Sequence, residues 1–209
     1  KLFLFIFYIK KRNIIIIINF YTVVYIVYIT NIPSPYQIKW AKYLRKYYEV
    51  EFWFMIDIED SATGRPSYWN IEMPEYCRVL PSWFKNRELC YGPTLYSELE
   101  KFNPDIVMLG AGWYMFSWMQ GYRWAVKHGK KIIAGPIEFS NSLFKISKIL
   151  RNRFIYKYLY KKVDMYFANA FLHYDYMDMA LGLKNKTLFM NYDDYAPYLE
   201  QSIRGTPEK

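Results

Sequence analysis

From residue 23 onward, short apolar runs alternate with segments in which apolar residues recur every three or four positions. The apolar runs predict strands at residues 23–29, 50–56, 105–110, 131–135, 164–169 and 186–190. The helical spacing predicts helices at residues 35–47, 93–104, 114–128, 142–162 and 171–181. Elements in this order form βαβ units. We therefore expect an α/β fold, a Rossmann-like doubly wound parallel sheet with helices on both faces.

Three parts of the chain differ in pattern. Residues 23–195 carry the alternation and are expected to form one Rossmann-like domain. Residues 1–22 are interpreted as a leader or as an extension of the first strand, with a membrane anchor as an alternative. Residues 196–209 are interpreted as a tail or linker. Residues 57–92 predict a long loop with a short strand at 77–80, and loops of that length are often functional.

In two of the predicted helices the apolar residues recur at a clear helical spacing. The helix at 35–47 should pack through its apolar positions Ile38, Ala41, Leu44, Tyr47 and Tyr48. The helix at 142–162 contains many cations and no acid, and its apolar positions include Ile146, Ile149, Leu150, Phe154, Tyr158 and Leu159. Such a helix either packs on a core with a solvated basic face, or touches an anionic membrane or phosphate groups through Lys148, Arg151 and Lys157.

Amino-acid composition limits the kinds of binding partner that we expect. The net charge of +9 favours anionic partners, but no nucleic-acid motif accompanies it, so nucleic acid is not expected. The two cysteines lack C-x-x-C spacing and only two histidines are present, which argues against a metal site and favours a reducing, cytoplasmic location. The 22% of aromatic residues reflects either codon bias or a site that stacks sugar rings on aromatic side chains.

The motifs do not define a known nucleotide site. Gly110 and Gly112 follow a strand as in a dinucleotide fingerprint, but Met115 stands where the third glycine belongs, which favours a simple tight turn. The sequence contains neither a P-loop nor a G-x-S-x-G elbow. Asp57 and the acids that follow it could hold a cation or lie solvated on a loop. Ligands of a doubly wound sheet bind at the carboxyl ends of its strands, so the turns there should form the functional surface.

The loop regions contain, in chain order, the stretches ITNIPSPYQIKWAKYL, GRPSYW, FNPDIVMLGAGWYMFSW, GPIEFS, VDMYFANAFLHYDYMDMALG and NYDD. Taken together in this order, they resemble the N-terminal half of family-four glycosyltransferases of the GT-B type. Gln37 stands where the family usually has arginine, and the turn before the first helix lacks the glycine pair of some members. In that family the sugar-nucleotide site lies mostly in a second domain.

The resemblance implies a function in polysaccharide synthesis. The chain would be the acceptor-side half of an enzyme that transfers a sugar from a nucleotide-sugar donor to a glycan or lipid-linked acceptor. The donor is a co-substrate, no cofactor is expected, and the protein would be cytoplasmic or peripheral on the inner membrane face. The alternatives are a non-catalytic α/β binding module at that membrane face and a flavodoxin-like nucleotide or flavin protein.

The same resemblance implies a set of binding residues: Ser34, Tyr36, Gln37, Arg65, Trp69, Gly112, Trp113, Tyr114 and Asn169. At the start of the first helix, side chains and amides would bind an acceptor sugar or a phosphate. Glu138 follows the strand at 131–135 and is the catalytic candidate, because a carboxylate there could orient acceptor hydroxyls or accept a proton. Its alternative role is to stabilise the start of the following helix.

Overall fold

The computed structural model describes residues 2–9, 14–21, 23–57, 72–83, 89–135, 146–168, 171–183 and 186–189. Within these ranges, the strands of the main sheet are β3 (Tyr25–Thr30), β4 (Glu49–Phe54), β5 (Cys77–Val79), β6 (Ile106–Leu109), β7 (Lys131–Ala134), β8 (Met165–Ala168) and β9 (Thr187–Phe189). Every neighbouring pair runs parallel. The strand order is β5-β4-β3-β6-β7-β8-β9, which is the doubly wound Rossmann order with one further strand.

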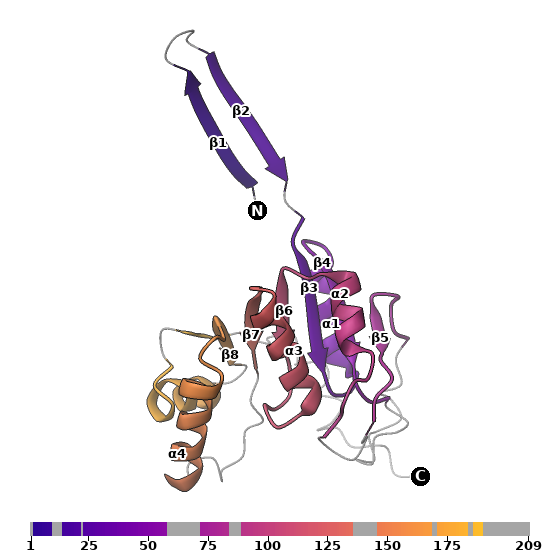
Figure 1. Cartoon of the computed structure of the whole chain (residues 1–209), viewed down its shortest axis with the longest axis vertical. Helices are drawn as coiled ribbons and strands as arrows, with labels where there is room; N and C mark the ends of the chain where they lie inside the picture. Colours follow the sequence, from indigo (N-terminus) through magenta and orange to yellow (C-terminus); the bar gives the residue numbers. More distant parts are fainter. Residues whose placement is uncertain are drawn as a thin grey trace, which may run out of the picture.

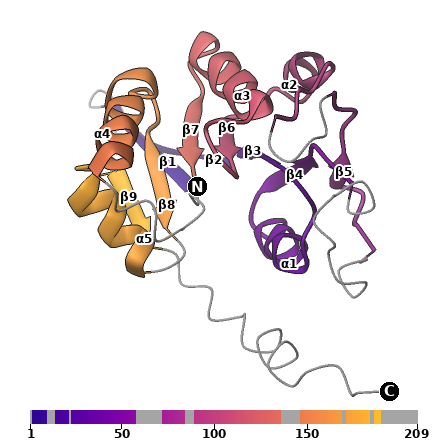
Figure 2. The same ribbon diagram turned by 90° about the horizontal axis from the view of Figure 1, so that it is seen from below.

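The helices cover both faces of this sheet. They are α1 (Pro35–Leu44), α2 (Leu95–Phe102), α3 (Phe116–Lys127), α4 (Ile146–Phe154) and α5 (Phe171–Asp175), and α4 and α5 continue into the π-helical turns η3 (Ile155–Leu159) and η4 (Tyr176–Ala180). Figure 2 shows α1 on one face and α2, α3 and α4 on the other. The predicted fold class is thus confirmed, and each predicted helix and strand corresponds to an observed one.

Alternation along β3 explains how one strand serves two cores. Ile26 and Tyr28 point to the cluster beneath α1, which also contains Ile38 of that helix. Val27 and Ile29 point to the larger cluster beneath α2, α3 and α4. Successive side chains of a strand point to opposite faces, so a central strand buried on both sides must be apolar throughout.

The predicted apolar positions are correct for α1 as far as Leu44, which packs partly buried against the cluster beneath that helix, and are mostly wrong after it and in α4. Ile38 and Ala41 are buried, but Tyr47 is 65% exposed, because the helix ends at Leu44 and the chain then turns away. In α4 and η3 the buried residues are Asn152, Ile155 and Tyr156. Of the predicted apolar positions, Ile149 packs partly buried against the larger core and the others are exposed. The polar Asn152 can be buried because its Nδ2 donates to the Tyr176 hydroxyl at 2.9 Å.

A two-stranded antiparallel hairpin precedes the sheet. It consists of β1 (Leu2–Ile9) and β2 (Ile14–Tyr21), and it extends away from the main sheet in Figure 1. The interpretation of residues 1–22 as a leader or strand extension stays a prediction. No helix in the described part of the chain has both the length and the apolarity to cross a bilayer.

Candidate functional site

The carboxyl ends of β3 and β6 meet at the point where the chain reverses its direction of winding. From β3 the chain crosses through α1 to β4, whereas from β6 it crosses through α3 to β7 on the other side. The two ends are level, because the Gly110 amide donates to the Ile29 carbonyl at 2.8 Å. Ligands of doubly wound folds bind at this switch point. The turns after β3 and β6 are therefore the first candidates for a site.

The turn after β3 contains two buried polar side chains with unused hydrogen-bonding capacity. Ser34 is the N-cap of α1 and is 1% exposed, yet its side chain makes no capping bond. Gln37 donates through Nε2 to Thr30 Oγ1 at 3.3 Å. Neither Ser34 Oγ nor Gln37 Oε1 has any other hydrogen-bond partner among the described residues.

The buried oxygens of Ser34 and Gln37 could bind a polar ligand. A buried group without a partner costs about 1–3 kcal/mol, a cost that a ligand could remove by supplying the missing bond. The first turn of α1 contains no acidic residue, so the partial positive charge at the helix N-terminus is not neutralised there. Tyr36 lies half-buried in the same turn. Hydroxyl, carboxylate and phosphate groups all fit such a helix start.

The turn after β6 owes its glycines to packing inside the chain. A Cβ on Gly110 would lie 2.3 Å from the Tyr28 hydroxyl, and a Cβ on Gly112 would lie 2.1 Å from the ring of Tyr114. Ala111 between them has a φ of 58°. The Tyr114 ring thus occupies the space beside Gly112. The geometry favours the tight-turn interpretation over the dinucleotide fingerprint.

Trp113 connects this turn to α4, the helix that contains Arg151. Its carbonyl accepts a hydrogen bond from the Tyr160 hydroxyl at 3.5 Å, and Arg151 Cζ lies 5.8 Å from the centre of its ring. Arg151 also donates to Asn152 Oδ1 at 3.3 Å from both Nε and Nη2. Arg151 therefore lies beside the edge of the sheet. Of the other two predicted membrane or phosphate contacts, Lys148 is half-buried and Lys157 is exposed.

The structure brings together part of the predicted site. Ser34, Tyr36 and Gln37 share one turn, and Trp113 and Tyr114 share the adjoining one, with Gly112 beneath them. Four predicted residues lie outside the described ranges: Arg65, Trp69, Glu138 and Asn169. Their roles stay predictions.

Sequence reasoning missed two residues at this edge. It did not single out Thr30, which accepts from Gln37, or Tyr28, which fills the space beside Gly110. Thr30 had a detectable signal, because it is a polar residue at the end of an apolar strand. In the described residues, no three histidine, cysteine or acidic side chains lie close enough together to hold a metal ion.

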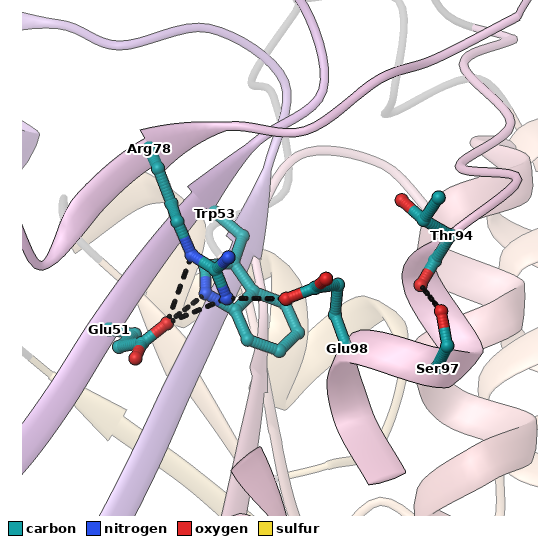
Figure 3. Close-up of polar contacts among 6 residues, drawn as sticks. All are labelled: Glu51, Trp53, Arg78, Thr94, Ser97 and Glu98. Carbon is teal, nitrogen blue, oxygen red and sulfur yellow. Dashed lines mark hydrogen bonds and ion pairs between the residues drawn. The ribbon is translucent and has the colours of Figure 1, made fainter. Parts of the chain in front are cut away.

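A second polar cluster lies near the β4–β5 edge (Figure 3). Glu51 Oε2 accepts hydrogen bonds from Trp53 Nε1 at 2.6 Å and from Arg78 Nε at 3.2 Å. Arg78 Nη2 also lies 2.8 Å from Glu98 Oε2. The Arg78 guanidinium covers the Trp53 ring at 5.0 Å. The cluster connects β4, β5 and α2, and its charged groups pair with one another. We interpret it as structural.

Comparison with known proteins gives a likeness of fold. No protein-family model matches the sequence, and no curated protein matches it either. The structure is similar to that of UDP-N-acetylglucosamine 2-epimerase from Rickettsia bellii, with a TM-score of 0.52 and 15% identity over 89% of this chain and 52% of the epimerase. A second UDP-N-acetylglucosamine 2-epimerase gives a TM-score of 0.47 and 14% identity over 80% of this chain and 48% of that one.

The chain spans about half the length of these two epimerases. At this level of identity the likeness concerns the Rossmann-like α/β fold, which agrees with the strand order described above. The resemblance to family-four glycosyltransferases stays a prediction, since no family model matches.

Proposed function

We propose that this chain is the acceptor-side half of a sugar-nucleotide enzyme with GT-B-like architecture. Within that class we propose a glycosyltransferase that moves a sugar from a nucleotide donor to a glycan or lipid-linked acceptor. The observation that carries the proposal is the start of α1, where Ser34 Oγ and Gln37 Oε1 are buried without further partners at the switch point of the sheet. The likeness to an epimerase with a GT-B-like fold supports the class.

The roles follow from the chemistry of each group. The Ser34 hydroxyl can donate to a sugar or phosphate oxygen, and Gln37 Oε1 can accept from a sugar hydroxyl. Trp113 and Tyr114, in the turn after the neighbouring strand β6, provide half-buried aromatic rings, which suit the apolar face of a sugar ring. Glu138 remains our proposed proton acceptor, and Arg65, Trp69 and Asn169 our proposed further contacts. A second domain would hold most of the donor.

One other enzyme class fits the same fold. The neighbour with the TM-score of 0.52 is an epimerase of UDP-N-acetylglucosamine, so the chain could belong to an enzyme that isomerises a nucleotide sugar without an acceptor. The products separate the two classes. A glycosyltransferase releases the nucleotide and extends the acceptor, whereas an epimerase leaves the sugar on its nucleotide and inverts one carbon.

The test compares Ser34→Ala with wild type in the complete protein, measuring nucleotide release and acceptor extension with a panel of UDP-sugars. An unpartnered buried hydroxyl contributes no bond to the free protein, so its removal should leave stability unchanged or slightly higher. If Ser34 binds substrate, the ratio kcat/KM should fall by about tenfold, which corresponds to one lost hydrogen bond of about 1.5 kcal/mol.

The matched control is Ser97→Ala. Ser97 Oγ donates to the Thr94 carbonyl at 2.7 Å in α2, away from the site. This control should keep full activity and lose a little stability, the reverse of the Ser34 pattern. A fully active Ser34→Ala enzyme would remove Ser34 from the site. Sugar isomerisation without transfer would favour the epimerase class, and absence of any turnover would favour a binding module.

A further inference from the structure

The helix α4 with its continuation η3 buries only a narrow face. Asn152 bonds to Tyr176, and the ring of Tyr156 meets that of Tyr166 edge-on at 5.5 Å. On this inner side Ile155 completes the contact with the core. Both Figure 1 and Figure 2 show α4 near β8, toward one end of the sheet. Ile149 also packs partly buried against this core and Lys148 is half-buried, whereas the other side chains of α4 and η3 are exposed.

An exposed row of large apolar side chains runs along the outer side. We name it the apolar ridge, and it consists of Ile146 (76% exposed), Leu150 (60%), Phe154 (55%), Tyr158 (59%) and Leu159 (56%). Single exposed apolar residues need no explanation, but several on one short helix form a patch typical of an interaction surface.

The π-helical turn η3 contributes to the alignment of the C-terminal part of this ridge. Four residues slightly exceed one α-helical turn, so a row with that spacing drifts around the helix. The Tyr160 amide donates to the Ile155 carbonyl at 3.0 Å, an i to i+5 bond that marks a wider turn. The wider turn offsets the drift over the last step of the row, from Phe154 to Tyr158. The rings of Phe154 and Tyr158 accordingly remain neighbours, with centroids 5.3 Å apart.

Cations surround the ridge. Every charged residue of segment 146–162 is basic: Lys148, Arg151, Arg153, Lys157, Lys161 and Lys162. The last three are exposed and have no acidic partner among the described residues. The first acid that follows, Asp164, is already bound to Lys131 at 3.0 Å. The surface therefore combines exposed apolar side chains with positive charge that is not neutralised locally.

We propose that the apolar ridge and its flanking lysines dock on an anionic lipid surface. Basic side chains are attracted to anionic headgroups while apolar side chains enter the boundary between headgroups and acyl chains. A second copy of the chain is a weaker candidate, because two such faces would bring like charges together. This inference is independent of the proposed enzymatic function.

The test measures binding of the full chain to vesicles by co-sedimentation. One set of vesicles contains phosphatidylcholine and phosphatidylglycerol mixed two to one, and the other contains phosphatidylcholine alone. Wild type should bind the anionic vesicles, bind the neutral ones far more weakly, and be released as salt is raised. Two variants separate the contributions. Leu150→Ser with Phe154→Ser removes part of the ridge, and Lys157→Gln with Lys161→Gln and Lys162→Gln removes charge.

Each variant should lower the partition coefficient by about tenfold or more. The controls carry matched changes elsewhere: Tyr43→Ser with Tyr47→Ser, and Lys42→Gln with Lys46→Gln and Lys127→Gln, all at exposed positions. They should bind as wild type does. Equal loss in the controls, unchanged binding of the ridge variant, or no binding by wild type would overturn the proposal. A concentration-dependent dimer abolished by the ridge variant would assign the face to a second copy instead.

Discussion

Replacing Gly110 with alanine should destabilise the protein through one steric conflict. The new Cβ would lie 2.3 Å from the Tyr28 hydroxyl oxygen, 2.6 Å from Cζ of the same ring and 2.8 Å from Thr30 Oγ1. Tyr28 is 2% exposed and its ring is held edge-on by Trp40 at 5.2 Å and Phe52 at 4.9 Å. The ring therefore has little room to withdraw.

The expected cost follows from this confinement. Inserting a methyl group into a packed interior costs about 1–3 kcal/mol. For a chain of this length, each kcal/mol lowers the Tm by about 2–4 °C. Urea unfolding followed by circular dichroism gives the free-energy change, and a thermal scan gives the Tm. Because Thr30 Oγ1 accepts the Gln37 bond, displacement of Thr30 should also weaken ligand binding at the start of α1.

Combining Gly110→Ala with Tyr28→Phe tests the reasoning. Tyr28→Phe removes the atom closest to the new methyl group, so the double variant should be more stable than the sum of the two single changes. Gly129→Ala is the control, because a Cβ there meets no atom within 4 Å, although its φ of +63° adds backbone strain. Its effect should not depend on Tyr28. Wild-type stability of Gly110→Ala, or strict additivity with Tyr28→Phe, would refute the account.

Three further predictions concern polar and thiol groups. Arg78→Leu leaves the Glu51 carboxylate without its cation and should cost about 0.5–1 kcal/mol in urea unfolding, since the pair is part-exposed; no change would mean that the cluster is not stabilising. Burial raises the pKa of Asp164, but hydrogen bonds from the Ile132 amide and the Lys131 ammonium outweigh burial, so its pKa is lowered overall. As pH falls below about 4, the carboxyl of the unfolded chain takes up its proton before that of the folded chain, so the free energy of unfolding should decline. It should decline less steeply with pH in Asp164→Asn, and identical slopes in the variant and wild type would contradict this. Burial raises the pKa of the Cys77 thiol to about 12 and also raises the pKa of the Cys90 thiol. A thiol reagent at pH 8 should therefore label both cysteines only after unfolding, and rapid labelling of the native protein would disprove the burial.

The order and type of the elements could be predicted because the local pattern dictates them. A strand such as β6 is apolar on both faces because it lies in the middle of the sheet. A glycine such as Gly129 marks the end of α3 because the backbone there adopts a φ of +63°, which glycine tolerates. The start of α1 was also predictable, since Pro35 at the first helical position and Ser34 before it are typical of a helix N-terminus. The observed bounds differ from the predicted ones by a few residues.

The packed face of a helix was less predictable. Helical spacing shows that Ile146, Leu150 and Phe154 share a side of α4, but not that this side faces outward. The inner side is fixed by the bond of Asn152 to Tyr176, a residue 24 positions later in the chain. The same holds for the site, where the closeness of Tyr28 to Gly110 depends on tertiary packing. Contacts across such separations leave no pattern in a short window of sequence.

The position of β3 in the middle of the sheet has a consequence for how the chain folds. β3 can pair with β4 early, since the two are joined by one short helix. Its other neighbour, β6, is fixed through contacts such as that between the Tyr25 amide and Asp105, which are 80 residues apart. Closing so long a loop is slow, and on the ribosome β3 must remain unpaired on one apolar edge until β6 has been synthesised. This chain should therefore depend on chaperones, or on low temperature during expression, more than its thermodynamic stability alone would suggest.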